Sequence, residues 1–391
     1  MVPEKIAENV YSMRINHFNR RMFDALIPLP DGTSYNAYLV RGTGKTALMD
    51  SADPEKKDAL FDFLRDVEKI DYLVAHHAEQ DHSGSLPFVL EKYPAARVAA
   101  NPRCKEFLMS HLHLPAEKFI EVKDGGRLDL GGKTLRFIYT PWVHWPETMV
   151  TYLEEDRILF SCDFFGSHIA TGELFSDEKT VYGPMKRYYA EIMMPFRSSI
   201  KSNLEKIKEL ELALIAPSHG PIHKNVKFAL DAYKDWALSE AKNKVLVAYI
   251  SMHGSTLLLV NRLVSRLQEK GVPVEKINLD EFDIGCVAMA LVDAATVVIG
   301  TPTVLAGPHP KAVYAAYLAN ALRPKTRFVS VVGSYGWGGR ALETIAGMIS
   351  GIKAEALKPV MVKGMPTADD LLEVDALAGL IAEKHKSLAF S

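Results

Sequence analysis

The second half of the sequence constrains the fold most strongly, because apolar runs typical of strands alternate strictly there with stretches of helical periodicity. The expected strands cover 245–250, 274–279, 296–300, 328–333 and 359–362, and the expected helices cover 256–270, 286–292, 311–322, 339–350 and 368–384. Neighbouring parallel strands need crossovers of this kind between them. The pattern therefore predicts a doubly wound, five-stranded parallel sheet.

The first half has a less regular order of elements. Short strand-like runs occur at 9–15, 34–40, 46–50, 72–75, 97–100, 135–140, 158–161 and 212–216. Helical patterns separate several of them, and one helix opens at Asp53-Pro54, since Asp caps free N–H groups and Pro is tolerated in the first turn. This mixture predicts an αββα arrangement. A polar helix at 228–243 would link the two halves, so we expect one domain over 1–243 and another over 244–391.

Length and composition narrow the class of protein. A chain of 391 residues, with 48% apolar and 24% charged residues, is expected to form two or three well-packed domains. The formal charge of -2 gives no reason to expect nucleic acid or an anionic membrane as partner. No apolar run approaches the roughly 20 residues that span a bilayer, and the N-terminus has no apolar signal-peptide core.

The cysteines point to a reducing compartment. Cys104, Cys162 and Cys286 lie far apart and form no Cys-x-x-Cys pair. This spacing excludes a disulfide framework, and it excludes a thiolate zinc or iron–sulfur site built from this chain alone. We therefore expect a cytoplasmic protein.

The strongest chemical signal is the segment His77–His82, which holds four potential metal ligands directly after the run 72–75. A chain that turns at the end of a strand can direct successive side chains into one pocket, whereas a continuing strand alternates them between two faces. Further candidates follow three other strand-like runs, where loops commonly carry ligands. The seven candidates are His77, Glu79, Asp81, His82, His144, Asp163 and His219. Seven ligands are too many for one tetrahedral site, so we expect two metal ions that share a carboxylate.

The types of ligand indicate which metal is expected. Four histidines and three carboxylates, without a thiolate, favour a hard and higher-coordinate pair such as iron or manganese over zinc. The carboxylate of Glu79 supports this choice because it stabilises a more oxidised metal. The competing interpretation is a set of unrelated polar residues at strand ends. For His219 alone, this interpretation explains the residue as well as a role as metal ligand does. For the segment His77–His82, it is a poor explanation.

Three loops in the second half have the composition of a flavin mononucleotide site. In a doubly wound sheet such loops converge at the carboxyl ends of the strands. The first loop has hydroxyl groups and a glycine that can hold a phosphate at a helix N-terminus. The other two would flank a flat ring, with Trp337 either stacked on it or packed in a flexible turn. No Gly-x-Gly-x-x-Gly is present, which disfavours NAD(P) and FAD. The candidate residues are Ser251, Met252, His253, Gly254, Ser255, Thr256, Thr301, Pro302, Thr303, Val304, Leu305, Ala306, Ser334, Tyr335, Gly336, Trp337, Gly338 and Gly339.

The chain resembles the flavodiiron proteins (A-type flavoproteins, which include the rubredoxin:oxygen oxidoreductases) over nearly its whole length. The likeness rests on the three loops above and on the segments His77–Gly84, Trp142–Thr148, Asp163–Gly166 and Pro217–Pro221. It implies a metallo-β-lactamase-like αββα half followed by a flavodoxin-like half. It also implies a set of ligands for each of two irons: His77, Glu79 and His144 for one, Asp81, His82 and His219 for the other, with Asp163 as the bridge.

The resemblance further implies an activity and partners. The expected reaction is reduction of O2 to water, of NO to nitrous oxide, or both, with electrons that enter through FMN from a separate rubredoxin or from reduced coenzyme F420. A head-to-tail homodimer, or a dimer of such dimers, would bring the flavin of one chain close to the irons of the other. Tyr189 is a candidate hydrogen-bond donor to an intermediate, against the simpler interpretation of a buried structural tyrosine.

Two positions depart from the family pattern. Asp24 stands where many members have a histidine next to the irons, which leaves the preference between O2 and NO open. Thr256-Leu257 begins a helix where an acidic residue is common, and we expect little consequence from it.

Two rival functions compete with this interpretation. The first is a dinuclear zinc hydrolase with a flavodoxin-like appendage, and Glu79 argues against it. The second is an electron carrier or flavin-based sensor with a structural metal site. Seven ligands that leave coordination positions open argue against that second rival.

Overall fold

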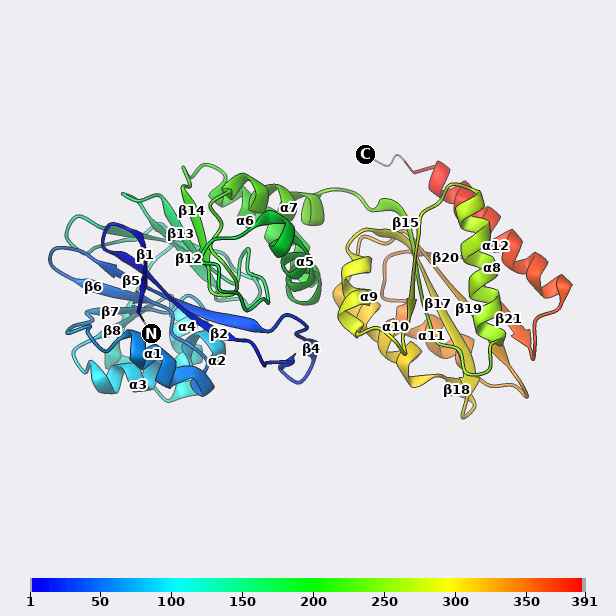
Figure 1. The fold of residues 1–391 in the computed structure, drawn as a ribbon, viewed down its shortest axis with the longest axis horizontal. Coiled ribbons are helices and arrows are strands. Elements are labelled where there is room, and N and C mark those ends of the chain that lie inside the picture. Colours follow the sequence, from blue (N-terminus) through cyan, green and yellow to red (C-terminus); the bar gives the residue numbers. More distant parts are fainter. Residues whose placement is uncertain (1, 389–391) are drawn as a thin grey trace. The chain divides into compact units, whose positions relative to one another are not determined.

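The computed structural model describes residues 2–388, which form two compact units (Figure 1). The first unit holds the chain up to Tyr189 together with Phe196–Ala237, and the second holds Ala190–Pro195 and the chain from Leu238. A domain boundary near residue 243 stays a prediction. Within residues 2–388, no helix combines the length and the apolar character needed to cross a membrane.

The first unit contains two large sheets and a small hairpin. The seven-stranded sheet has the order β1 (Glu4–Ala7), β2 (Val10–His17), β5 (Thr33–Arg41), β6 (Thr46–Met49), β7 (Tyr72–Val74), β8 (Arg97–Ala100), β9 (Phe119–Glu121). The five-stranded sheet has the order β10 (Arg127–Asp129), β11 (Thr134–Tyr139), β12 (Met149–Leu153), β13 (Ile158–Cys162), β14 (Leu214–Pro217). The hairpin consists of β3 (Met22–Phe23) and β4 (Ile27–Pro28).

The sheets pack against each other and are covered by helices. Buried side chains of both sheets, such as Val40 and Met49 from the first and Phe137 and Phe160 from the second, form one apolar cluster. Helices α1 (Lys57–Phe63), α3 (Leu86–Lys92) and α4 (Pro102–Leu112) bury residues against the outer face of the first sheet. Helices α5 (Glu178–Tyr188), α6 (Arg197–Ile207) and α7 (Val226–Leu238) lie beside the second sheet (Figure 1). This layering confirms the predicted αββα arrangement.

The carboxyl ends of several strands meet along the seam between the two sheets. Strands β6, β7 and β8 run parallel in the first sheet, as do β13 and β14 in the second. The N–H of Met149, in β12, donates to the carbonyl of His76, just after β7, at 3.1 Å. The N–H of Asn36, in β5, donates to the carbonyl of Ser218, just after β14, at 2.8 Å. These hydrogen bonds hold the loops after β7 and β14 in register with the opposite sheet.

The second unit is a parallel sheet with helices between its strands, as predicted. Its main order is β16 (Val274–Asn278), β15 (Lys242–Tyr249), β17 (Ala294–Val304), β19 (Phe328–Tyr335), β20 (Glu355–Ala356). The fifth strand expected at 359–362 is β21 (Val360–Lys363), which pairs in parallel with β19 as the additional short strand β20 does. Strand β18 (Gly307–Pro308) pairs with the end of β17. The helices are α8 (Ser255–Glu269), α9 (Ile284–Leu291), α10 (Pro310–Leu322), α11 (Ala341–Ile349) and α12 (Ala368–Lys386).

Two local predictions need correction. The helix expected at 228–243 is α7, which ends at Leu238, and β15 already begins at Lys242. Helix α7 is also no polar linker, because it buries Tyr233 and Trp236 in the first unit. Strand β12 was absent from the expected strands, since all five of its residues are buried and show no alternation of polar and apolar side chains.

Gly333 gives a test of the packing of the second unit. It lies in β19 beside β17, where an added Cβ atom would lie 2.1 Å from the carbonyl oxygen of Thr301. We expect Gly333→Ala to lower the free energy of unfolding by about 1–3 kcal/mol, as overpacking does in other cores. Thermal unfolding of the flavin-free chain, followed by circular dichroism, measures this change.

Gly347→Ala is the matched control. Gly347 lies in α11, and an added Cβ would meet nothing within 4 Å. This substitution should raise the free energy of unfolding by about 0.5–1 kcal/mol, because alanine loses less conformational entropy in a helix. Equal destabilisation by both substitutions would contradict the argument from close packing.

Candidate metal centre and flavin cleft

The seven candidate ligands lie together at the seam between the sheets of the first unit, with Asp163 in the middle. Oδ2 of Asp163 lies 3.6 Å from Nε2 of His77 and 3.7 Å from Nε2 of His144. Oδ1 of the same carboxylate lies 3.0 Å from Nε2 of His82 and 3.4 Å from Nε2 of His219. Each oxygen of Asp163 therefore faces its own pair of imidazoles.

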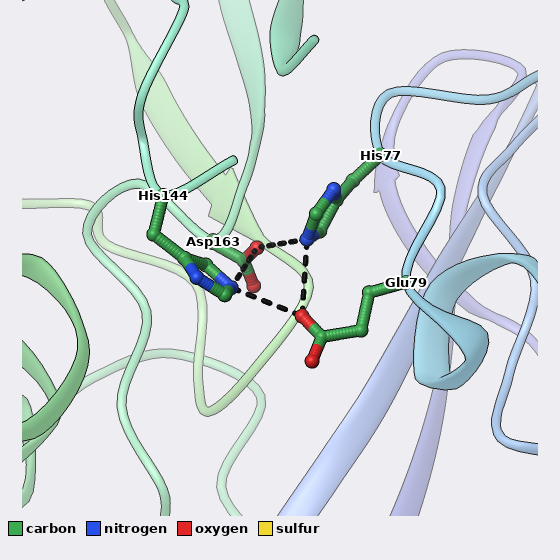
Figure 2. A group of neighbouring side chains, drawn as sticks. All are labelled: His77, Glu79, His144 and Asp163. Atoms are coloured by element: carbon green, nitrogen blue, oxygen red, sulfur yellow. Dashed lines mark hydrogen bonds and ion pairs between the residues drawn. The ribbon is translucent and has the colours of Figure 1, made fainter. Parts of the chain in front are cut away.

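The first group of donors surrounds Glu79. Oε2 of Glu79 lies 3.0 Å from Nε2 of His77 and also 3.0 Å from Nε2 of His144. Figure 2 shows these three side chains and Asp163 directed toward one another, with His77 and Glu79 on one loop and His144 and Asp163 on two others. We call His77, Glu79, His144 and Oδ2 of Asp163 the Glu79 cluster.

The second group surrounds Asp81. Nε2 of His219 lies 3.1 Å from Oδ2 of Asp81, and Nε2 of His82 lies 3.4 Å from Oδ1. We call Asp81, His82, His219 and Oδ1 of Asp163 the Asp81 cluster. All four side chains of this cluster are almost completely buried.

Local structure explains why these side chains converge. Glu79 is the N-cap residue of the short helix α2 (Gln80–Ser83), so the chain turns sharply after β7 and presents Asp81 and His82 from its first turn. Asp163 directly follows β13, and His219 follows β14. Gly220, after His219, has a φ of +79°, and a Cβ there would lie 2.0 Å from Oγ of Ser167. The return of the chain after His219 therefore requires glycine.

The buried side chain of Asp50 links the ends of β6, β7 and β14 through hydrogen bonds. Asp50, just after β6, accepts hydrogen bonds from the backbone N–H of His76 at 2.9 Å and from Nδ1 of His76 at 2.7 Å. It also accepts one from the hydroxyl of Ser218 at 3.2 Å. These contacts fix the residues that directly precede His77 and His219.

Three ligand imidazoles are oriented through Nδ1. Nδ1 of His77 lies 2.7 Å from a carboxylate oxygen of Glu147, and Nδ1 of His219 lies 2.7 Å from the carbonyl oxygen of Ser34. Nδ1 of His82 lies 3.8 Å from Sγ of Cys162. Because Nδ1 is engaged on the outer side, Nε2 of each ring faces the clusters, which is the usual arrangement of histidines that bind metals.

In the metal-free site, protonated imidazoles lie beside ionised carboxylates. Burial opposes the charged form of His77, but hydrogen bonds with Glu147 and Glu79 raise its pKa well above the ordinary value. Burial likewise opposes a charge on His219, and Asp163 and Asp81 nevertheless raise its pKa to about 10. The pKa of Asp163 lies well below its usual range, because the neighbouring imidazoles outweigh the effect of burial. Protons thus occupy positions from which a metal cation would displace them.

The residues fit a pair of metal cations. Within the described part of the chain, both carboxylate oxygens of Asp81, Oδ2 of Asp163 and Nε2 of His82 are buried without a partner in hydrogen-bond geometry, although ring nitrogens lie nearby. Buried polar atoms are normally satisfied, so these orphaned atoms indicate a bound cation. Carboxylate and imidazole donors without a thiolate suit iron.

The structure places Tyr188, not Tyr189, at this site. The hydroxyl of Tyr188 donates to Oδ1 of Asp163 at 2.7 Å. Tyr189 is buried against Tyr233 and Trp236, and its hydroxyl lacks a hydrogen-bond partner within residues 2–388. Successive helical residues point about 100° apart, and α5 gives way at Tyr189 to a π-helical turn. These contacts favour the simpler interpretation of Tyr189 as a buried structural tyrosine, while the tyrosine at the site, Tyr188, was not among the candidates from the sequence.

Aromatic residues and a carboxyl group border the Glu79 cluster. The ring of Trp145 lies 4.9 Å from the ring of His77 in an edge-on arrangement, while Trp142 stacks on Phe196 at 5.8 Å. Asp24, in the turn between β3 and β4, lies close enough to Glu79 for the two carboxyl groups to interact. Burial, together with the charges of Glu79 and Asp81, raises the pKa of Asp24 to about 6.

The second unit has a cleft of about 290 Å³ at the carboxyl edge of its sheet. Its lining residues are Ser251, Met252, His253, Ser255, Thr256, Pro302, Thr303, Ser334, Tyr335, Gly336, Trp337 and Gly364. The hydroxyls of Thr256 and Ser334 lie 3.0 Å apart and join the first loop to the third. The ring of Trp337 is 79% exposed, which leaves a face free for stacking.

Several candidate flavin residues do not line this cleft. Thr301 is buried within β17, and Leu305 is 92% exposed at the turn between β17 and β18. Gly254, Val304, Ala306, Gly338 and Gly339 are likewise absent from the lining. Gly364, which sequence reasoning missed, directly follows β21. A glycine after the fifth strand at the same edge of the sheet was the available signal.

Comparisons with known proteins agree with the two units. The family model described as "ODP family beta lactamase" matches residues 33–220, and the flavodoxin model matches residues 247–376. The chain is 33% identical over 396 residues to a nitric oxide reductase of Moorella thermoacetica, with 98% of each chain covered. These matches confirm the predicted order of a metallo-β-lactamase-like fold followed by a flavodoxin-like fold.

Solved structures have a similar fold along 98% of this chain. The rubredoxin oxygen:oxidoreductase from Desulfovibrio gigas has a TM-score of 0.94 at 30% identity, over 98% of this chain and 99% of that chain. The flavodiiron protein from Giardia intestinalis has a TM-score of 0.91 at 26% identity, over 98% of each chain.

Asp24 provides a test of the charge balance in the metal-free protein. Because folding raises the pKa of Asp24 from the ordinary 3.8 to about 6, its ionisation opposes folding. This destabilisation sets in above pH 3.8, is about half developed at pH 5 and is complete at pH 8. We expect Asp24→Asn to raise the melting temperature by about 2–4 °C at pH 8 and by about half as much at pH 5. This range corresponds to about 1 kcal/mol, after allowance for solvent screening of an exposed group.

The measurement is thermal unfolding of chelator-treated protein at both pH values. Asp231→Asn, at an exposed site on α7 beside Lys227, is the control and should show no dependence of its effect on pH. The same gain in melting temperature at pH 5 and pH 8 for Asp24→Asn would refute the argument.

Proposed function

Since this chain belongs to the flavodiiron proteins, we propose that it reduces O2 to water, NO to nitrous oxide, or both, at two irons in its first unit, with electrons that pass through FMN in its second. The observation that supports this proposal most directly is the carboxylate of Asp163, whose two oxygens face two separate sets of donors. When bound, the irons supply open coordination positions for a diatomic gas and two electrons, and the flavin supplies two more.

The two clusters support an assignment of ligands. His77, Glu79 and His144 would hold one iron, Asp81, His82 and His219 the other, and Asp163 would bridge them. Three carboxylates offset most of the charge of two divalent cations, which makes their burial tolerable. The imidazoles present neutral Nε2 atoms once their protons have been displaced.

Other residues of the site hold protons and exclude water. Burial, and then the negative charge of Asp163, raise the pKa of Tyr188 well above its ordinary value, so its hydroxyl stays a donor at any physiological pH. Phe23 is buried with its ring 5.3 Å from that of His168 and 6.4 Å from that of His219. This aromatic wall, with Trp145 beside His77, keeps bulk water from the donors.

The cleft of the second unit would hold the flavin mononucleotide. The hydroxyls of Ser251, Ser255 and Thr256 lie at the N-terminus of α8, where a phosphate is favoured by free N–H groups and by the helix dipole. Trp337 would stack on the flat ring. The phosphate and the ring would thus be held by different loops.

We further propose a head-to-tail homodimer, alone or paired into a dimer of dimers. Exposed apolar side chains gather near each site: Phe18, Met22, Leu26 and Trp142 around the metal centre, and Met252, Leu305, Trp337 and Met365 around the flavin cleft. Large exposed apolar patches mark interaction surfaces. In such a dimer the flavin of one chain would serve the irons of its partner.

The electron donor and the compartment are part of the same proposal. A separate rubredoxin or reduced coenzyme F420 would reduce the flavin, and neither nucleic acid nor a membrane is required. Cys104, Cys162 and Cys286 lie far apart in the sequence and form no Cys-x-x-Cys pair, which supports a reducing cytoplasm as the location.

The function is tested by the metal and flavin content of the purified chain and by its reaction with each gas. We expect two irons and one FMN per chain. After anaerobic reduction, the protein should consume O2 without releasing hydrogen peroxide, convert NO to nitrous oxide, or do both. Asp163→Asn should bind little iron and lose at least about 100-fold in gas consumption, since even weaker changes around metal sites have effects of 10- to 100-fold.

Asp231→Asn serves as the control and should keep iron, flavin and activity, because its carboxylate pairs only with lysines on the surface. Two zinc ions in place of iron, together with hydrolytic activity, would instead establish the dinuclear hydrolase. A reduced protein that reacts with neither gas would leave only an electron carrier.

The dimer is tested by light scattering after size-exclusion chromatography. Leu305→Asp should weaken dimerisation at least about tenfold, which corresponds to about 1.4 kcal/mol of binding free energy. Leu372→Asp, at an exposed leucine on α12, is the control and should leave the dimer intact. A monomeric wild-type chain with full gas-reducing activity would rule out the proposed transfer between chains.

A further inference from the structure

A second buried carboxylate lies directly behind one of the candidate ligands. Glu147 lies in the loop between β11 and β12, and its Oε1 lies 2.7 Å from Nδ1 of His77. Both side chains are fully buried, with 0% of their surface exposed. The same oxygen accepts a hydrogen bond from the backbone N–H of Ala78 at 3.0 Å. Two donors on one oxygen hold this carboxylate in a single orientation.

The contact determines which nitrogen of His77 faces the metal site. A carboxylate accepts hydrogen bonds and does not donate them, so the proton of the neutral imidazole sits on Nδ1. The lone pair of Nε2 then points at the Glu79 cluster, 3.0 Å from Glu79 and 3.6 Å from Asp163. Glu147 thereby selects the tautomer that can bind a metal ion.

Within residues 2–388, no carboxylate accepts a hydrogen bond from Nδ1 of either imidazole of the Asp81 cluster, although the carboxylate of Asp50 lies within 4.8 Å of His82. Nδ1 of His219 donates to a neutral carbonyl, that of Ser34, and Nδ1 of His82 faces the neutral thiol of Cys162 at 3.8 Å. A carboxylate partner makes an imidazole a stronger ligand than a carbonyl or a thiol does, because it stabilises positive charge on the ring. The two clusters thus differ in their outer support although their ligands are similar.

We propose that Glu147 is a positioning residue that acts selectively on the metal position of the Glu79 cluster. It orients His77, fixes its tautomer and places a buried negative charge behind it. The metal position of the Asp81 cluster does not depend on Glu147. This inference rests on the proposed two-metal site and adds an asymmetry between its halves.

Two substitutions separate the charge of Glu147 from its hydrogen bond. Glu147→Gln keeps an oxygen that accepts from Nδ1 of His77 and from Ala78, and its amide nitrogen takes the place of Oε2, which has no hydrogen-bond partner within the described chain. Glu147→Leu removes both the charge and the acceptor. Glu121→Gln is the matched control, because Glu121 is a half-exposed carboxylate that pairs with Lys105.

The measurement is anaerobic titration of the metal-free full-length chain with Fe²⁺. The wild type and Glu121→Gln should bind two Fe²⁺ per chain with unchanged affinities. In Glu147→Gln the affinity of one position should fall about tenfold, and in Glu147→Leu about 100-fold, while the other position stays within twofold of the wild type. Partial recovery by glutamine relative to leucine is the signature of oriented support, which loss of packing alone does not produce.

The outcomes distinguish this inference from the function on which it rests. A wild-type chain that binds no pair of Fe²⁺ ions overturns the proposed function itself. A wild type with two Fe²⁺, and Glu147 variants that bind both ions as tightly or lose both equally, overturns only the role of Glu147. Circular dichroism reports whether the metal-binding unit of each variant has folded.

Discussion

One shared carboxylate organises the metal-binding unit. Asp163 is buried between four imidazoles, and each of its oxygens faces two of them. A buried carboxylate in such a position is tolerated only with opposite charge close by. The imidazoles supply that charge in the metal-free state, and cations supply it in the loaded state. The strand ends, the sharp turn into α2 and the glycine after His219 all serve to place donors around this one residue.

In each unit the site lies at the carboxyl ends of parallel strands, but the chemistry of the two sites differs. In both, ligands gather where parallel strands end, because the following loops converge there while the strands keep their ends rigid. The loops of the first unit carry long ionisable side chains that reach a common point. The loops of the second carry hydroxyl groups and glycines, which leave the backbone accessible to a phosphate and a flat ring.

The second unit and the metal site were predictable from the sequence, because both follow from patterns among residues that are close together in the chain. Alternation of strands and helices predicts the second unit, and the dense segment His77–His82 predicts a metal site. What escaped prediction depends on distant packing. The choice between Tyr188 and Tyr189 follows from the rotation of α5 against the site, and the role of Glu147 follows from a loop that folds back onto β7. Strand β12 has no polar face that would reveal it, since both its faces are covered.

The donors come from both leaves of the sandwich: His77, Glu79, Asp81 and His82 follow a strand of one sheet, while Asp163 and His219 follow strands of the other. Ions bound by all of them would cross-link the two sheets and close a long stretch of chain into a loop. In secreted proteins, disulfide bonds cross-link distant parts of the chain in this way. In this chain, whose cysteines lie far apart in the sequence, bound iron would take that part, so that loss of iron would weaken the fold as well as remove the chemistry.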